Sequence, residues 1–342
     1  VGLTPSGGAV AFFLDAACSQ PASSLGLAAG SAQAGFFFKG SAVGAYSVAA
    51  ASTGLTGASQ AITITLAPAD RLVFLTAPQT LVAGNCSAVV QVQARDMNGV
   101  PAAVTADTAV ALSAGAGGAF FADAACSVAT SSATLASGAH TTSFFFRGSA
   151  AGALAVNAQV SGWAQVTQTQ TIVAGPKDRL AFVTPQRSVV AGACSPAVTI
   201  GITDALGNTT TSVTPVTVNL TASPGTSFGL FSDAACTLPV SSAVLGAGSA
   251  GVSVFFKGSA AAQVVLSATA SGLGGATQDA LVRPEAPTRL TFVTPPRTAV
   301  AGSCSGVLTV QAQDAFGNPS VVASSASIAV TPAPSGGVTF YS

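Results

Sequence analysis

The sequence predicts an all-β protein built from antiparallel, two-layered β-sandwich domains of about 110 residues, and three observations support this. Segments such as 88–94 and 307–312 alternate apolar and polar residues, which is the period of a half-buried strand. Val, Thr, Ile and Phe dominate these runs, and clusters of Gly, Pro, Asn, Asp and Ser separate them. Finally, no segment shows the 3.6-residue period and the caps of a helix.

An internal repeat sets the domain organisation. Two motifs show it: Arg-Leu-x-Phe-x-Thr begins at residues 71, 179 and 289, and Asp-Ala-Ala-Cys begins at residues 15, 123 and 233. The spacing of about 110 residues suits one sandwich of about seven short strands. We therefore expect complete repeats at 68–176 and 177–286, the C-terminal half of a repeat at 1–67, and the N-terminal half of a repeat at 287–342.

The connections between repeats are short. They are marked by Pro68, by Pro176 and by the segment from Pro284 to Pro287. Short connections favour end-to-end stacking of the sandwiches, each about 40 Å long, into an extended rod. The halves at 1–67 and 287–342 indicate a window cut from a longer array, or halves that complete one another between neighbouring chains.

The charge content excludes several classes of protein. Lys and Arg together number 11, as do Asp and Glu, and charged residues make up 6% of the chain, against about 25% in an ordinary soluble domain. No basic patch is available to neutralise phosphates, so no nucleic-acid partner is expected. The mean hydropathy is +0.61, yet no run approaches the roughly 20 apolar residues of a membrane span. Few charges guard the sheet edges, which favours end-to-end or lateral homo-assembly.

Several short motifs carry a resemblance to a known family. Asp-x-x-Gly-Asn occurs at 204–208 and 314–318, and the segment 95–99 departs from it by exchanging the order of Gly and Asn. The segments 138–146 and 151–156 are similar to the late strands of the same family. The chain thus resembles the bacterial Ig-like (Big) domains of invasin and intimin type. The resemblance implies tandem Ig-like sandwiches on a bacterial surface, although paired cysteines are not a general feature of that family.

Six cysteines recur at two per repeat, which predicts one disulfide in each: Cys86 with Cys126, and Cys194 with Cys236. Cys18 and Cys304 lie in the half repeats, and we expect each to pair with a residue of a neighbouring half repeat. Such regular pairing indicates an extracellular, oxidising location. A metal site is not expected, because there is no Cys-x-x-Cys motif and the only histidine, His140, has no counterpart in the other repeats.

Two sets of repeated residues are candidate interface positions: Phe37, Phe145 and Phe255, and Arg71, Arg179 and Arg289. By the period of a strand, the middle Phe of each run shares a face with a basic residue and points away from the core. The alternative is a bulge or a covering loop that buries it. Each Arg begins a repeat. One interpretation is that it bridges neighbouring domains, for example to a carbonyl or to Asp70 or Asp178. The other is that it lies at an exposed strand edge.

The recurring aspartates are expected to shape turns: Asp96, Asp204 and Asp314 in one set, and Asp15, Asp123 and Asp233 in the other. The carboxylates are too sparse for calcium, and no pair of them has a spacing that suggests acid–base catalysis. We expect no catalytic residue, no cofactor and no enzyme activity.

The sequence therefore favours an extracellular structural protein whose tandem domains form a surface fibre or filament. One alternative is the stalk of a cell-surface adhesin that binds its ligand, a glycan or another cell-surface molecule, through another region. The other alternative is an accessory rod of a secreted enzyme.

Overall fold

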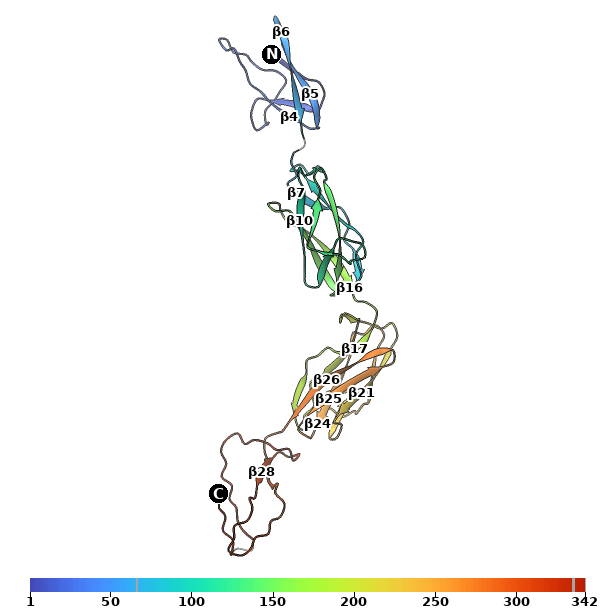
Figure 1. Ribbon diagram of the computed structural model, residues 1–342, viewed down its shortest axis with the longest axis vertical. Helices are drawn as coiled ribbons and strands as arrows, with labels where there is room; N and C mark the ends of the chain where they lie inside the picture. Colours follow the sequence, from blue (N-terminus) through green and yellow to red (C-terminus); the bar gives the residue numbers. More distant parts are fainter. Residues whose placement is uncertain (66, 334–335, 342) are drawn as a thin grey trace. The chain divides into compact units, whose positions relative to one another are not determined.

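The computed structural model describes residues 1–65, 67–333 and 336–341, and all regular structure within them is β-strand (Figure 1). This confirms the all-β prediction. The chain divides into two compact units: residues 1–79, 86–147 and 154–170 form the first, and residues 80–85, 148–153 and 171–342 form the second. Among the described residues, no helix is present that could cross a membrane.

Residues 179–283 form one sandwich inside the second unit. Its strands are β17 (Arg179–Phe182), β18 (Arg187–Val190), β19 (Val198–Thr203), β20 (Thr209–Thr210), β21 (Val216–Ser223), β22 (Phe228–Phe231), β23 (Ser242–Leu245), β24 (Gly251–Gly258), β25 (Ala262–Ala270) and β26 (Leu273–Arg283). They are hydrogen-bonded in the order β22-β24-β19-β17-β26-β25-β21-β23, with β20 beside β19 and β18 beside β26.

The two halves of this strand order fold over one apolar core. β21 alternates buried and exposed residues from Val216 to Leu220, so one of its faces turns inward. Leu180, Ile200 and Phe256, from one half of the order, share a cluster of buried side chains with Val218 from the other half. Burying two apolar sheet faces against each other is what holds a sandwich together.

Residues 71–173 carry the same strand order. Their strands are β7 (Arg71–Phe74), β8 (Thr80–Val82), β9 (Val90–Arg95), β10 (Thr108–Ala114), β11 (Gly118–Phe121), β12 (Ala129–Thr130), β13 (Ser132–Leu135), β14 (Thr141–Gly148), β15 (Gly152–Gln159) and β16 (Val166–Val173). One sheet has the order β13-β10-β15-β16-β8 and the other β12-β11-β14-β9-β7. These orders match β23-β21-β25-β26-β18 and, apart from β12, β22-β24-β19-β17.

The two ends of the chain carry only part of this pattern. Residues 1–65 hold β1 (Gly2–Pro5), β2 (Val10–Phe13), β3 (Pro21–Ala22), β4 (Phe37–Gly40), β5 (Gly44–Ser52) and β6 (Leu55–Ile64). These form two three-stranded sheets, β1-β5-β6 and β3-β2-β4, with a small core around Leu3 and Phe12. Residues 287–333 hold one pair, β27 (Arg289–Phe292) with β28 (Val310–Gln313).

Candidate functional site

Asp204 organises the turn that follows β19. One carboxylate oxygen, Oδ1, accepts hydrogen bonds from the backbone N–H groups of Leu206 and Asn208, at 2.9 and 2.8 Å. The other, Oδ2, accepts one from the N–H of Gly175 at 2.7 Å and one from the side-chain amide of Asn208 at 2.9 Å. Gly175 belongs to the segment that precedes β17, so this buried carboxylate ties the connection to the turn.

Asn208 extends the turn to a distant loop. Its Nδ2 donates to the carbonyl oxygen of Ser149 at 2.9 Å, and its Oδ1 accepts from the N–H of Ala151 at 2.8 Å. Both loop residues belong to the same compact unit as the turn, and they lie between β14 and β15. An asparagine side chain offers one acceptor and two donor hydrogens, and here it uses the acceptor and both donors.

The same arrangement recurs one repeat later. Asp314 Oδ2 accepts from the N–H of Glu285 at 3.0 Å and from the Asn318 side chain at 2.8 Å. Asn318 donates to the carbonyl oxygen of Ser259 at 2.8 Å and accepts from the N–H of Ala261 at 2.7 Å. Because every contact has its counterpart, the Asp-x-x-Gly-Asn motif builds a repeated structure that goes beyond a turn.

An apolar contact accompanies each asparagine bridge. A Cβ placed on Gly84 would lie 3.1 Å from Cδ1 of Leu206, and one on Gly192 would lie 2.5 Å from the ring of Phe316. The φ angles of these glycines are 87° and 82°, a left-handed conformation that favours glycine. The glycine therefore both permits the turn of the chain and leaves room for the apolar side chain.

We refer to these two sets of contacts as the Asn208 joint and the Asn318 joint. The Asn208 joint comprises Gly84, loop 149–151, Gly175 and turn 204–208. The Asn318 joint comprises Gly192, loop 259–261, Glu285 and turn 314–318. In sequence, each joint connects a loop of one repeat to a turn of the next.

The electrostatics of the joints favour an ionised aspartate. Burial opposes the charge of Asp204, but the hydrogen bonds from Asn208, Gly175 and Leu206 outweigh it and hold the pKa of Asp204 below its ordinary value. The pKa of Asp314 is lowered in the same way, with burial opposed by hydrogen bonds from Asn318, Glu285 and Phe316. Each joint therefore contains a buried charge that is stabilised by hydrogen bonds.

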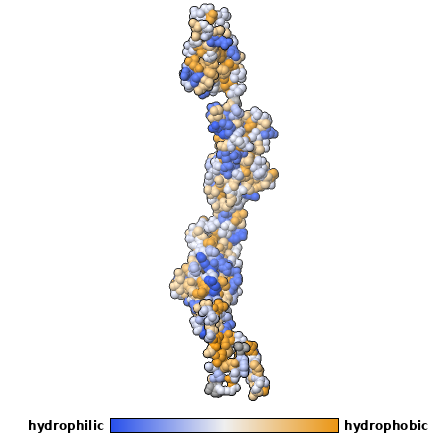
Figure 2. Space-filling model, turned by 90° about the vertical axis from the view of Figure 1, so that its left-hand side faces the viewer, coloured by the Kyte–Doolittle hydropathy of each residue, from blue (hydrophilic) through white to orange (hydrophobic). Residues whose placement is uncertain are grey.

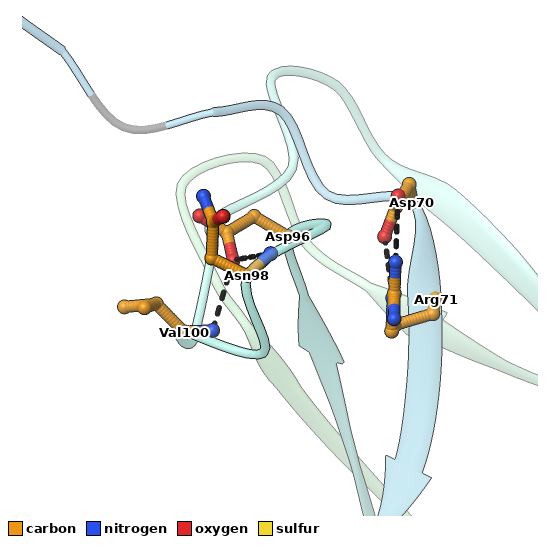
Figure 3. Close-up of polar contacts among 5 residues, drawn as sticks. All are labelled: Asp70, Arg71, Asp96, Asn98 and Val100. Atoms are coloured by element: carbon orange, nitrogen blue, oxygen red, sulfur yellow. Dashed lines mark hydrogen bonds and ion pairs between the residues drawn. The ribbon is translucent and has the colours of Figure 1, made fainter. Parts of the chain in front are cut away.

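The first turn of this type is built differently (Figure 3). Oδ1 of Asp96 accepts from the N–H groups of Asn98 and Val100, both at 2.9 Å. Val100 stands where the other turns have Asn208 and Asn318. Its side chain has neither donor nor acceptor, so it cannot form the bridge.

The repeated arginines lie at the starts of β7, β17 and β27. The Nε of Arg71 pairs with Asp70 at 2.8 Å, as Figure 3 shows, and that of Arg179 pairs with Asp178 at 2.8 Å. The partner in both cases is the preceding residue, and all four side chains are exposed by 44% or more. At Arg289 the preceding residue is Thr288. Their role as interface residues stays a prediction.

Two of the three repeated phenylalanines, Phe145 and Phe255, lie on the outer face of their strands, whereas Phe37 has an equally exposed neighbour, Phe38. Phe145 and Phe255 are half-buried, while the residues on either side of each are buried. In the register of β22 with β24, Phe231 is the direct partner of Phe255. Phe37 is 43% exposed. The faces of Phe145 and Phe255 follow the period of a strand, and the use of all three residues as contacts stays a prediction.

Two disulfides are present among the described residues. Cys86 is bonded to Cys126 and Cys194 to Cys236, each with a Cα–Cα distance of 5.7 Å. In each pair the second cysteine lies in an Asp-Ala-Ala-Cys loop.

In the first of these loops Asp123 accepts hydrogen bonds from the N–H groups of Ser127 and Val128, which is the turn-shaping role expected for it.

Cys18 and Cys304 carry no disulfide in the described part of the chain. Cys18 is half-buried and Cys304 is exposed. Their pairing with neighbouring half repeats stays a prediction. The described residues also contain no group of three or more His, Cys, Asp or Glu side chains close enough to hold a metal ion.

Comparisons with known proteins identify no family. No protein-family model and no curated protein matches the chain. Among solved structures, domains 4–9 of the surface layer protein SbsC match at 13% identity over 84% of this chain and 41% of that one, with a TM-score of 0.27.

Two further solved structures are of different kinds. Escherichia coli alpha-2-macroglobulin activated by porcine elastase matches at 15% identity over 77% and 26% of the two chains, with a TM-score of 0.33. A glycosyl hydrolase family 2 member from Bacteroides cellulosilyticus matches at 16% over 48% and 21%, with a TM-score of 0.27. The chain spans less than half the length of each of these three structures, and their similarity assigns it no function.

Proposed function

We propose that this chain is part of an extracellular structural protein whose tandem domains form a surface fibre or filament. The observation that carries the proposal is the recurrence of the asparagine bridge at Asn208 and Asn318, with the same partners in each joint. A polymer of domains resists bending only if its connections are held, and each joint holds its connection by several hydrogen bonds, each of about 1 kcal/mol.

The domain boundaries form part of the proposal. We take 68–176 and 177–286 as complete domains, with half domains at 1–67 and 287–342. The bacterial Ig-like resemblance of the Asp-x-x-Gly-Asn motif belongs here too, because that motif builds both joints. The domains act as structural elements, without catalysis or cofactor.

An oxidising, extracellular location is supported by the two disulfides, which form and persist outside the reducing cytosol. The low charge supports self-association as the mode of assembly. With charged residues at 6%, little repulsion keeps neighbouring copies apart.

Negative-stain electron microscopy of the native material tests the proposal, with the soluble fraction sized beside it. We expect continuous fibres with a regular subunit repeat. Separate thin molecules at every concentration would overturn the filament and favour the stalk of an adhesin whose ligand binds elsewhere.

A further inference from the structure

The Cys194–Cys236 disulfide lies beside the Asn318 joint. Cys194 follows Gly192, the glycine that faces Phe316, by two residues. Loop 259–261, which is hydrogen-bonded to the asparagine of the joint, begins where β24 ends. All of these residues belong to the second compact unit. Both parts of the 179–283 sandwich that contact the next turn are therefore near the disulfide.

Hydrogen bonds fix the segment around Cys194 to the end of β24. The N–H of Gly192 donates to the carbonyl oxygen of Gly258 at 2.8 Å. The N–H of Ser195 donates to the carbonyl oxygen of Phe256, whose own N–H donates to Oγ of the serine, both at 2.9 Å. The segment that carries the cysteine and the joint glycine is thus aligned with the strand that leads into the joint loop.

The second cysteine comes from a loop that is itself held in place. Sγ of Cys236 lies 3.6 Å from the carbonyl oxygen of Phe256. The carboxylate of Asp233 accepts hydrogen bonds from the N–H groups of Thr237 and Leu238, at 3.0 and 2.7 Å. The disulfide therefore connects a fixed loop to the segment that carries the joint glycine.

The first complete sandwich repeats these contacts. The N–H of Gly84 donates to the carbonyl oxygen of Gly148 at 2.8 Å. Ser87 exchanges two hydrogen bonds with Phe146, each of 2.9 Å. Cys86 stands between the glycine and the serine in sequence. A disulfide beside the glycine of a joint is thus a repeated feature of the chain.

We propose that the Cys194–Cys236 disulfide stabilises the Asn318 joint, so that reduction of the disulfide loosens the connection to the next repeat. With the bond intact, Gly192 and loop 259–261 keep the positions that the next turn requires. This rests on the proposed function and adds a redox regulation to it, because looser joints make a fibre more flexible.

Reduction acts on the joint rather than on the outer surface. Figure 2 shows hydrophilic and hydrophobic patches mixed along the visible face of the chain. Cys236 is 7% exposed and Cys194 is half-buried, so the disulfide contributes little to such a surface. The patches that copies use for contact stay in place while a joint loosens.

The redox step balances with dithiothreitol as the reductant. One thiolate of the reagent attacks a sulfur of the protein disulfide and releases one cysteine thiolate. The second thiol of the reagent then closes a ring and releases the other cysteine. One protein S–S bond breaks, two cysteine thiols form, and the reagent leaves as a cyclic disulfide.

The first test keeps both disulfides and weakens a joint. The 342-residue chain, with Cys18 and Cys304 blocked by alkylation, is equilibrated with reduced and oxidised dithiothreitol, and mass spectrometry gives the reduced fraction of each disulfide. We expect Asn318→Ala to favour reduction of Cys194–Cys236 by about tenfold, the factor of one lost hydrogen bond. The Cys86–Cys126 bond should not respond.

Asn208→Ala is the matched variant, because it weakens the other joint. It should favour reduction of Cys86–Cys126 and leave Cys194–Cys236 unchanged. A merely structural loss of stability would not produce this exchange of effects between two disulfides of one chain.

The second test reverses the direction, because coupling between two sites is reciprocal. In Cys194→Ser/Cys236→Ser, the amide of Ala261 should exchange faster than in the wild type by the same factor. The amide of Gly248 is the reference. It donates to the carbonyl oxygen of Ser212 at 2.9 Å and precedes the start of β24, whereas Ala261 follows its end. The chain-entropy effect of a disulfide acts on the unfolded chain, so local opening at Gly248 should not change.

Two results would overturn the proposal: disulfides that respond equally to both asparagine variants or to neither, or amides of Ala261 and Gly248 that change together. If native fibres form while the disulfides ignore the joints, the fibre function stands and this coupling is wrong. If the disulfides respond but native material shows no fibres, the coupling stands and the proposed function fails.

Discussion

The side-chain oxygen of Asn208 accepts a hydrogen bond from the backbone N–H of Ala151, 57 residues earlier in the chain, at 2.8 Å. The same relation connects Asn318 to Ala261, also 57 residues apart. A short amide side chain, repeated with the period of the sequence, thus reaches from each turn into the preceding repeat. The connections between repeats are therefore held by the side chains of Asn208 and Asn318, in addition to being short.

Replacing Asn208 by alanine removes both bonds to loop 149–151 and leaves the N–H of Ala151 unpaired. We expect a loss of about 1–2 kcal/mol in the free energy of unfolding of the joint. Hydrogen exchange of the Ala151 amide measures it. Asn219→Ala, at an exposed position of β21, is the control and should leave that amide protected. Equal exchange in the two variants would contradict the bridge.

Val100→Asn should introduce the bridge where the chain lacks it. The substitution creates Asp-x-x-Gly-Asn at 96–100, and the backbone of the turn is already held by Asp96. We expect the amide of Val43, which corresponds to Ala151, to exchange more slowly. Val100→Leu supplies a side chain of similar size without an amide and should change nothing. A slower exchange in both variants would show that the amide is not responsible.

Acid should weaken the joints. Because the pKa of Asp204 is lowered in the folded state, its ionised form contributes stability above the unfolded pKa of about 3.9, and this is lost as the pH falls through the lower folded value. Urea unfolding between about pH 3 and pH 7 measures the loss. In the Asp204→Asn variant, the free energy of unfolding should change less steeply with pH below about pH 4 than in the wild type. Parallel curves for the two proteins would contradict a contribution from Asp204. Asp314 and other aspartates with lowered pKa values keep their own share of the slope.

At neutral pH Asp204→Asn should also be less stable than the wild type. The new amide would direct a donor at the N–H of Gly175 or at the side chain of Asn208, where Oδ2 now accepts from both. A donor left without an acceptor costs about 1–3 kcal/mol. Thermal unfolding at pH 7 gives the difference, and an unchanged midpoint would mean that the turn adapts.

Comparing Gly192→Ala with Gly302→Ala separates the effect of disturbing the Asn318 joint from the effect of placing alanine in a left-handed backbone conformation. The new Cβ would lie 2.5 Å from the ring of Phe316. Gly302 has a similar φ, 84° against 82°, but nothing lies within 4 Å of the corresponding Cβ position. We expect Gly192→Ala to speed hydrogen exchange at Ala261, and Gly302→Ala to leave it unchanged. The same exchange rate in both would refute the contact with Phe316.

Removing the Cys86–Cys126 bond should cost its sandwich about 4 kcal/mol in the chain-entropy model, because the bond closes a separation of 40 residues. The double variant with serine at both positions avoids a free thiol. Calorimetry should show one transition moved to lower temperature and the transition of the Cys194–Cys236 sandwich unmoved. An unchanged profile would mean that the bond contributes nothing.

Local patterns predicted much of the fold. The period-two runs identify strands such as β9 and β28, and the repeat spacing indicates which cysteines face each other. The outer face of Phe145 and Phe255 follows from the same period. These features depend on short-range alternation or on recurrence, both of which can be seen in one sequence.

The joints were not predictable in the same way. Asp-x-x-Gly-Asn indicates a turn, but the partners of its asparagine lie 57 and 59 residues away, at backbone atoms that no side-chain pattern reveals. The repeated arginines were predicted as candidate bridges between domains, because charged residues are scarce in this chain. Asp70 and Asp178, which the sequence offered as partners, do pair with Arg71 and Arg179. That these arginines also lie at an interface stays a prediction. The recurrence of Asp-x-x-Gly-Asn is visible in the sequence, but the hydrogen bonds that its asparagine forms depend on the tertiary structure.

The most direct test of the repeated joint is residue-resolved hydrogen exchange on the wild-type chain. Three amides occupy one position in successive loops: Val43, Ala151 and Ala261. The account predicts that Ala151 and Ala261, which donate to Asn208 and Asn318, exchange about tenfold or more slowly than Val43, the factor expected for a bond of about 1.4 kcal/mol. Three equal, fast rates would contradict the joints and the fibre built on them.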